Sequence, residues 1–146
     1  MIENKGFSIL NHLRRDSRKS LSKISKETGI PLSTVFDNIK KLEKKIIKKY
    51  VSLIDFSKMG YNLKVNFILK SGDKKEELKQ FLLSNKNVNS LLRLNGEADF
   101  LVEGIFKDMK ELEEFNNKLD GHKIVNKMEH HIIEEIKTEG FIESIL

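Results

Sequence analysis

LSKISKETGIPLSTVFDNIK, residues 21–40, has the pattern of two short helices joined by a tight turn. Ser20 suits the N-cap of the first helix, and Gly29 ends that helix because glycine accepts a positive φ. Pro31 cannot continue a helix but can open the next one. The second helix is predicted from apolar residues that recur at helical spacing along one stripe. These residues are Leu32, Val35, Phe36, Ile39, Leu42 and Ile46.

Three positions of the same stretch match the helix-turn-helix pattern in residue type. Ser25 is small at the fifth position, where the two helices cross closely, and Gly29 occupies the turn. Val35 is β-branched at the fifteenth position and is expected to lock the second helix onto the first. A small helical bundle would share this spacing, but it would not explain the polar face of the second helix or the charge distribution.

Positive charge is concentrated in the first third of the chain. Residues 1–50 hold 13 Lys and Arg against 5 Asp and Glu, a net charge of +8, whereas residues 51–146 hold 14 against 17, a net charge of −3. A field that attracts phosphate requires charges gathered on one part of the surface. The amino-terminal part is therefore predicted to face double-stranded DNA.

The second helix of the motif is expected to enter the major groove by its amino-terminal end. Asn38 can pair bidentately with adenine, and Asp37 can accept a hydrogen bond from cytosine. Lysines farther along add salt-dependent affinity without choosing a sequence. The predicted DNA-binding residues are Ser33, Thr34, Asp37, Asn38, Lys40, Lys41 and Lys44.

The rest of the chain alternates between strand and helix patterns. Residues 46–56 favour β structure and predict a β wing. Strands are then expected at 61–69, 88–94, 99–106 and 124–136, with helices around 78–82 and 109–119. The order βαββαβ is ferredoxin-like, with both helices on one face of an antiparallel sheet. The predicted fold is α+β, with a winged helix-turn-helix in residues 1–56 joined to a βαββαβ domain in residues 57–146.

Several of these strands are apolar on both faces. Leu91-Leu92, Phe100-Leu101-Val102 and Ile105-Phe106 are examples. The sheet face without helices is therefore not suited to water, and a second copy of the chain is the simplest cover for it. The sequence predicts a homodimer.

Composition excludes several other classes of protein. The chain has no cysteine, so it holds no disulfide, thiolate metal site or cysteine nucleophile. No apolar run approaches the roughly 20 residues that span a bilayer, and Met1–Lys5 lacks the apolar stretch of a signal peptide. We expect a cytoplasmic protein with no membrane partner, no cofactor and no metal.

In their order and spacing, several segments resemble the Lrp/AsnC family of transcriptional regulators. These are Ile9–Leu10, Ile30–Val35, Ile39–Glu43, Ile47–Tyr50, Met59–Tyr61 and Leu94–Val102. The resemblance implies regulation of amino-acid metabolism, dimers built by sheet-to-sheet packing, and often octamers or other assemblies of dimers.

The resemblance also implies a small effector, commonly an amino acid, bound near a glycine hairpin. The effector-binding residues would be Asn95, Gly96, Glu97, Ala98 and Asp99. The backbone at Gly96 could receive an α-carboxylate, and Asp99 could receive an α-ammonium group. The alternative is a turn glycine followed by a capping aspartate.

Two other functions compete with a sequence-specific regulator. Sirohaem decarboxylase subunits share this architecture, and a tetrapyrrole enzyme would use His12, His122, His130, His131 and Arg93. Adjacent His130 and His131 would point to opposite faces of a strand, and Arg93 is the only arginine after residue 18, so we predict no catalytic activity. The second alternative, an architectural oligomer that binds DNA without sequence preference, is suggested by a basic face rich in lysine rather than arginine.

Overall fold

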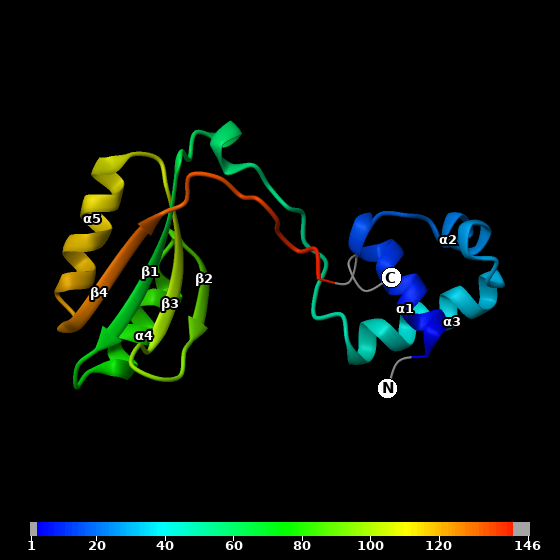
Figure 1. The fold of residues 1–146 in the computed structure, drawn as a ribbon, viewed down its shortest axis with the longest axis horizontal. Helices are drawn as coiled ribbons and strands as arrows, with labels where there is room; N and C mark the ends of the chain where they lie inside the picture. The colour runs from blue at the N-terminus through cyan, green and yellow to red at the C-terminus, as the bar shows by residue number, and fades with distance from the viewer. Residues whose placement is uncertain (1–2, 142–146) are drawn as a thin grey trace. The chain divides into compact units, whose positions relative to one another are not determined.

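The structure is a computed structural model that describes residues 3–141 and separates into two compact units (Figure 1). The described residues up to Leu53 and from Ile136 onward form the first unit, and Ile54–Glu135 form the second. The sequence-based division instead ends the first domain at residue 56 and assigns residues 136–141 to the second; residues 142–146 lie outside the described part. The chain therefore passes between the units twice.

The first unit contains three helices, α1 (Asn4–Arg15), α2 (Leu21–Thr28) and α3 (Leu32–Lys45). The predicted start of α2 is confirmed, since the Ser20 side chain accepts a hydrogen bond from the backbone N–H of Lys23. The helices enclose one core. Its buried residues are Ile9, Leu10, Leu13, Ile24, Ile30, Val35, Ile39 and Leu42.

The turn between α2 and α3 is held by side chains as well as by backbone geometry. Gly29 has a φ of +70°. The Ser25 hydroxyl donates to the carbonyl of Ile30 at 2.6 Å, and the Thr28 hydroxyl accepts from the Ile30 N–H at 3.3 Å. Ser25 is therefore more than a small residue at a helix crossing, because it also satisfies a polar group of the turn.

The apolar stripe of α3 is narrower than the sequence suggested. Val35, Ile39 and Leu42 are buried, but Leu32, Phe36 and Ile46 are 49%, 44% and 42% exposed. Phe36 follows Val35 by one residue, a rotation of about 100° around the helix, which carries its ring away from the core. The prediction that Phe36 lies in the buried stripe is wrong.

The strand predicted in residues 46–56 is not formed. Residues 46–55, all of them described, contain no helix or strand, and a short 3-10 helix η1 follows at Phe56–Met59. A strand requires a hydrogen-bonded neighbour, and no described segment pairs with these residues. Tyr50 instead ties the segment to α3 by donating its hydroxyl to Glu43 Oε1 at 3.0 Å.

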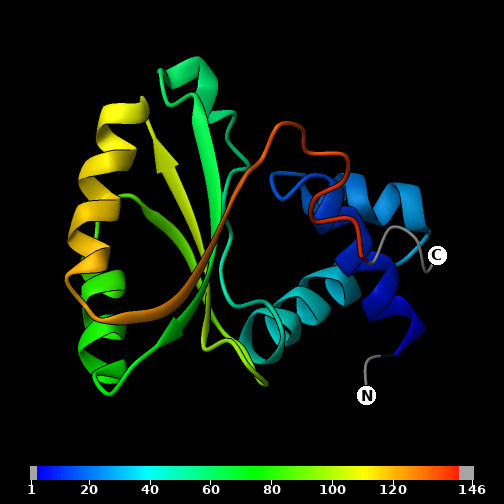
Figure 2. The same cartoon turned by 60° about the vertical axis from the view of Figure 1, so that its left-hand side comes forward.

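The second unit has the predicted order βαββαβ. Its elements are β1 (Leu63–Ser71), α4 (Lys75–Ser84), β2 (Val88–Arg93), β3 (Phe100–Phe106), α5 (Met109–Asp120) and β4 (Ile124–His131). The strands form one antiparallel sheet in the order β2-β3-β1-β4. Both helices cover the same face of this sheet (Figure 2).

Aromatic rings fill the space between the sheet and its helices. Phe67 of β1 lies 5.2 Å from Phe115 of α5 between ring centroids, and Phe106 of β3 lies 5.3 Å from Phe115. Such contacts add to the apolar area that each ring buries. Two strands and a helix are thereby held around one centre, together with the buried Val65 and Leu69 of β1.

The last strand is shorter than predicted. β4 ends at His131, which pairs with Val65, and Ile132 donates the final backbone hydrogen bond to Lys64. β1 begins at Leu63, so residues beyond 133 have no strand residue opposite them. The chain leaves the sheet at this point.

The sheet face without helices carries both apolar and charged side chains. Leu92 and Met128 are 55% and 47% exposed, and Ile68 is half-buried. On the same face, Lys64 pairs with Glu103 at 3.2 Å. The face is open in the single chain, as the strand pattern indicated.

We predict that Gly29→Ala lowers the free energy of unfolding by roughly 1–2 kcal/mol, because an L side chain is strained at this φ. An added Cβ would meet no atom within 4 Å, so the loss would come from backbone conformation alone. Urea denaturation monitored by circular dichroism measures it. Gly29→Asn should lose less, since asparagine tolerates this conformation; equal losses for the two variants would contradict the explanation.

Candidate nucleic-acid interface

The surface of α3 opposite the core combines short polar side chains with lysines. Burial of Val35, Ile39 and Leu42 turns the other side of the helix outward. Exposed residues there include Ser33, Asp37, Lys40, Lys41 and Lys44. The polar side chains lie near the start of the helix and the lysines toward its end.

Thr34 and Asn38 lie at the flank of this surface and are half-buried. The Asn38 side-chain amide donates to the carbonyl of Thr34 at 2.8 Å. Asn38 also borders a small cavity of about 150 Å³ that Glu3 and Gly6 share. Asp37 and Asn38, the residues expected to choose the DNA sequence, therefore differ in accessibility. Asp37 is exposed, whereas the side-chain amide of Asn38 is hydrogen-bonded to its own helix.

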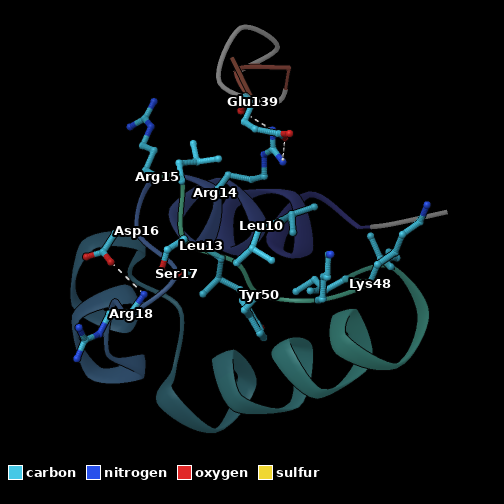
Figure 3. A pocket seen from close by; sticks show the side chains of 16 residues that line it. Leu10, Leu13, Arg14, Arg15, Asp16, Ser17, Arg18, Lys48, Tyr50 and Glu139 are labelled. Carbon is cyan, nitrogen blue, oxygen red and sulfur yellow. Dashed lines mark hydrogen bonds and ion pairs between the residues drawn. The ribbon is translucent and has the colours of Figure 1, made fainter. Parts of the chain in front are cut away.

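Further basic residues surround a cavity of about 640 Å³ at the end of α1 (Figure 3). Leu10 and Leu13 contribute apolar surface to it. The basic residues that line it are Arg14, Arg15, Arg18, Lys48 and Lys49.

A carboxylate from the end of the described chain lies among these cations. Arg14 Nη1 contacts Glu139 Oε2 at 3.0 Å, and Arg14 Nη2 donates to the Glu139 carbonyl (Figure 3). This pair could not be predicted from the sequence, because 125 residues separate its members and no periodic pattern surrounds Glu139. The ion pair neutralises part of the basic surface at this end of the unit.

Lys19 is also paired within the unit. Its ammonium group contacts the Glu27 carboxylate and lies 3.0 Å from His12 Nδ1. The hydrogen bond from Lys19 lowers the pKa of Glu27 below its usual value. These contacts tie α1 and the following loop to the end of α2.

In the second unit, a short loop that contains Gly96 joins the antiparallel strands β2 and β3. Leu94 donates its N–H to the carbonyl of Asp99 at 2.8 Å, and Gly96 has a φ of +88°. Asn95, Gly96 and Glu97 are exposed, and Ala98 is half-buried.

Asp99 is buried and fully engaged by neighbouring elements. Its carboxylate accepts from the Ser71 N–H at 2.9 Å, from the Ser71 hydroxyl at 2.8 Å and from Lys75 Nζ at 2.5 Å. The hydrogen bond from Lys75, helped by those from Ser71, holds the pKa of Asp99 well below its ordinary range. The carboxylate thus fastens the turn to the end of β1 and the start of α4.

The histidines are dispersed over the structure. His122 stacks on Phe81 with ring centroids 4.5 Å apart, and His131 contacts Glu129 at 2.9 Å. His130 pairs with Asn66 and His131 with Val65, so the two face opposite sides of the sheet. Within residues 3–141, no three histidine, aspartate or glutamate side chains gather to hold a metal ion, and no helix is long and apolar enough to cross a bilayer.

Two domain families match the chain. Residues 3–45 match a winged helix-turn-helix DNA-binding domain, and residues 63–140 match the Lrp/AsnC ligand binding domain. The chain belongs to the Lrp/AsnC family. This protein is accordingly a transcriptional regulator with a DNA-binding helix-turn-helix and a small-molecule-binding domain.

Relatives of this Lrp/AsnC regulator are also named as transcriptional regulators. An uncharacterized HTH-type transcriptional regulator of Pyrococcus furiosus is 31% identical over 144 residues, with 97% of each chain covered. Another from Pyrococcus abyssi is 27% identical over 143 residues, again with 97% of each covered. These names do not favour the tetrapyrrole enzyme as an alternative.

Solved structures share the fold. LrpC of B. subtilis matches with a TM-score of 0.86 and 22% identity, over 94% of this chain and 99% of LrpC. A transcriptional regulator of Neisseria meningitidis, crystallised as an L-Met complex, matches with a TM-score of 0.84 and 22% identity over 94% of each chain. The agreement extends across both units of the Lrp/AsnC chain.

We predict that Asp99→Asn lowers the free energy of unfolding at pH 7 by about 1–3 kcal/mol, because the buried network loses the negative charge and one of its two acceptor oxygens. The folded-state pKa of Asp99 is depressed, so its stabilising contribution is present above the unfolded-state pKa near 4 and is lost as pH falls below that value.

Urea denaturation at pH 7 and at pH 3 tests this prediction. The difference in stability between the parent protein and Asp99→Asn should shrink at pH 3. Asp73→Asn, in the exposed turn after β1, is the matched control and should change little. A difference between Asp99→Asn and the parent that is equally large at both pH values would contradict the role of the carboxylate charge.

Proposed function

We propose that α3 reads DNA sequence in the major groove, with its short polar side chains toward base edges and its lysines toward phosphates. The supporting observation is the outward surface of α3, which presents both kinds of side chain opposite a fully buried stripe. The base-facing residues are Ser33, Thr34, Asp37 and Asn38, and the phosphate-facing residues are Lys40, Lys41 and Lys44.

Among the polar residues, Asp37 carries most of the sequence choice in this proposal. Its exposed carboxylate can accept a hydrogen bond from the cytosine amino group. Asn38 reads adenine only after its amide leaves the Thr34 carbonyl, which is 2.8 Å away in the free protein. The lysines supply affinity that falls with salt and depends little on sequence.

We further propose that the regulator acts as a homodimer and as a higher assembly of dimers, such as an octamer. The open sheet face with exposed Leu92 and Met128 supports a subunit contact there. The protein is proposed to work in the cytoplasm without catalytic activity, in line with the names of its relatives.

The proposed effector is an amino acid that binds at the turn between β2 and β3. The ligand of the Neisseria meningitidis regulator, L-Met, supports this class of molecule. Asn95, Gly96, Glu97 and Ala98 remain accessible enough to contact it, and the space beside Gly96 is open within 4 Å. Asp99 contributes by fixing the turn, because its own carboxylate already has three hydrogen-bond donors.

DNA selection tests the first proposal. Sites bound by the purified protein are enriched from random double-stranded DNA, and the selection is repeated with Asp37→Ala and Lys41→Ala. Asp37→Ala should change the base preferred at one position of each half-site, whereas Lys41→Ala should weaken selected and random DNA alike by about tenfold and reduce the salt dependence by about one counterion.

Two results would contradict sequence readout by α3. If no sequence is enriched, the protein is an architectural DNA-binding oligomer rather than a sequence reader. If both variants lose the same affinity for selected and random DNA, Asp37 has no part in readout. Glu114→Ala, an exposed change on α5, should leave all of these measurements unchanged.

Calorimetric titration with L-Met and then with the other standard amino acids tests the effector proposal. One of them should bind, and Glu97→Ala should weaken it by about tenfold or more, because a charged hydrogen-bond partner is lost. Glu114→Ala again provides the control. Binding that Glu97→Ala leaves unchanged would place the effector elsewhere, and absence of binding by every amino acid would exclude this class of effector.

A further inference from the structure

Phe36 is an exposed aromatic residue within the helix that is proposed to read DNA. Its side chain is 44% exposed, although the adjacent Val35 is completely buried. Phe36 therefore contributes only part of its apolar surface to the core of the unit. Single exposed apolar residues are common on proteins, so its neighbours decide what the ring is suited to bind.

The neighbours of Phe36 place it at the edge of the basic surface. Leu32, Phe36 and Lys40 follow one another at intervals of four residues and share one side of α3. Leu32 is 49% exposed, and Lys40 Nζ lies 4.4 Å from the centroid of the Phe36 ring. An apolar surface and a positive charge are thus adjacent, as they would be beside a base edge and its phosphate.

The major groove offers one apolar group that fits such a surface. Thymine presents its C5-methyl there, whereas the other groups on the base edges that distinguish the pairs are hydrogen-bond donors and acceptors. Ser33 and Asp37, which flank Phe36 along the outward surface, would meet those polar groups.

We propose that Phe36 forms a binding subsite for the C5-methyl group of thymine, and that Lys40 leaves the ring to contact the neighbouring phosphate. The subsite rests on the proposed function of α3 and adds a base preference that its polar residues do not supply. In the free protein, the cation over the ring keeps Lys40 next to the position of that phosphate.

Removal of the methyl group from DNA tests this subsite directly. The probe is the duplex recovered by selection with the parent protein, in which each thymine is replaced singly by 2′-deoxyuridine. At one thymine in each half-site the replacement should weaken binding of the parent protein about fourfold, the amount expected for one buried methyl group. Phe36→Ala should bind the thymine duplex more weakly and should show no further loss with deoxyuridine.

Two variants complete the design. Phe36→Leu keeps an apolar side chain and should retain part of the deoxyuridine effect, so it remains informative if Phe36→Ala is unstable by circular dichroism. Leu83→Ala removes a 59% exposed apolar side chain from α4 and should show the full effect of the parent protein.

Other outcomes overturn the subsite. Equal losses of affinity on deoxyuridine replacement for the parent, Phe36→Ala and Phe36→Leu would exclude contact between this ring and the methyl group. A selected consensus without thymine would exclude it as well. Both results would leave sequence readout by α3 intact. Failure to enrich any sequence would overturn the proposed function and the subsite together. A change in oligomeric state of Phe36→Ala, with deoxyuridine losses equal to those of the parent, would assign the ring to a subunit contact instead.

Discussion

Burial of one narrow stripe of α3 is the constraint on which the first unit depends. Val35, Ile39 and Leu42 pack into the core formed with α1 and α2, and their burial fixes the rotation of the helix about its axis. A rotation of one residue position, about 100°, would bury Phe36 and turn a core residue toward solvent. The outward surface of Ser33, Asp37 and the lysines is therefore a consequence of packing. The Ser25 and Gly29 contacts in the turn then fix where this surface begins.

The second unit uses a different kind of interaction to hold the turn between β2 and β3. Its core combines aromatic and aliphatic side chains and includes none of residues 95–98, so the turn between β2 and β3 needs a separate anchor. Asp99 provides it by accepting hydrogen bonds from β1 and α4 while buried. A buried carboxylate is costly unless it is paired, and Lys75 together with Ser71 supplies the compensation. The Asp99 carboxylate, which the sequence suggested as an effector contact, thus positions the turn of residues 95–98.

Elements that a local residue pattern determines could be predicted from the sequence, whereas features that depend on a neighbouring strand, helix or distant residue could not. The helix-turn-helix, the βαββαβ order and the Ser20 cap follow from local patterns, and all are present. Residues 46–55 have β-forming composition but no strand to pair with, and β4 stops where β1 begins. Phe36 fits the apolar period yet sits at the edge of the stripe, a distinction that needs the positions of α1 and α2. The Arg14–Glu139 pair joins distant parts of the chain and has no local signature.

The two connections between the units adjoin the same pair of strands. One connection precedes β1 and the other follows β4, and these strands are hydrogen-bonded antiparallel neighbours, with Val65 opposite His131. Both connections therefore leave the sheet at the same end of the same pair. In the first unit, residues 46–53 of one connection and Glu139 of the other line the same cavity beside Arg14. The end of α1 beside this cavity packs against α3 through the core that the helices of the first unit share.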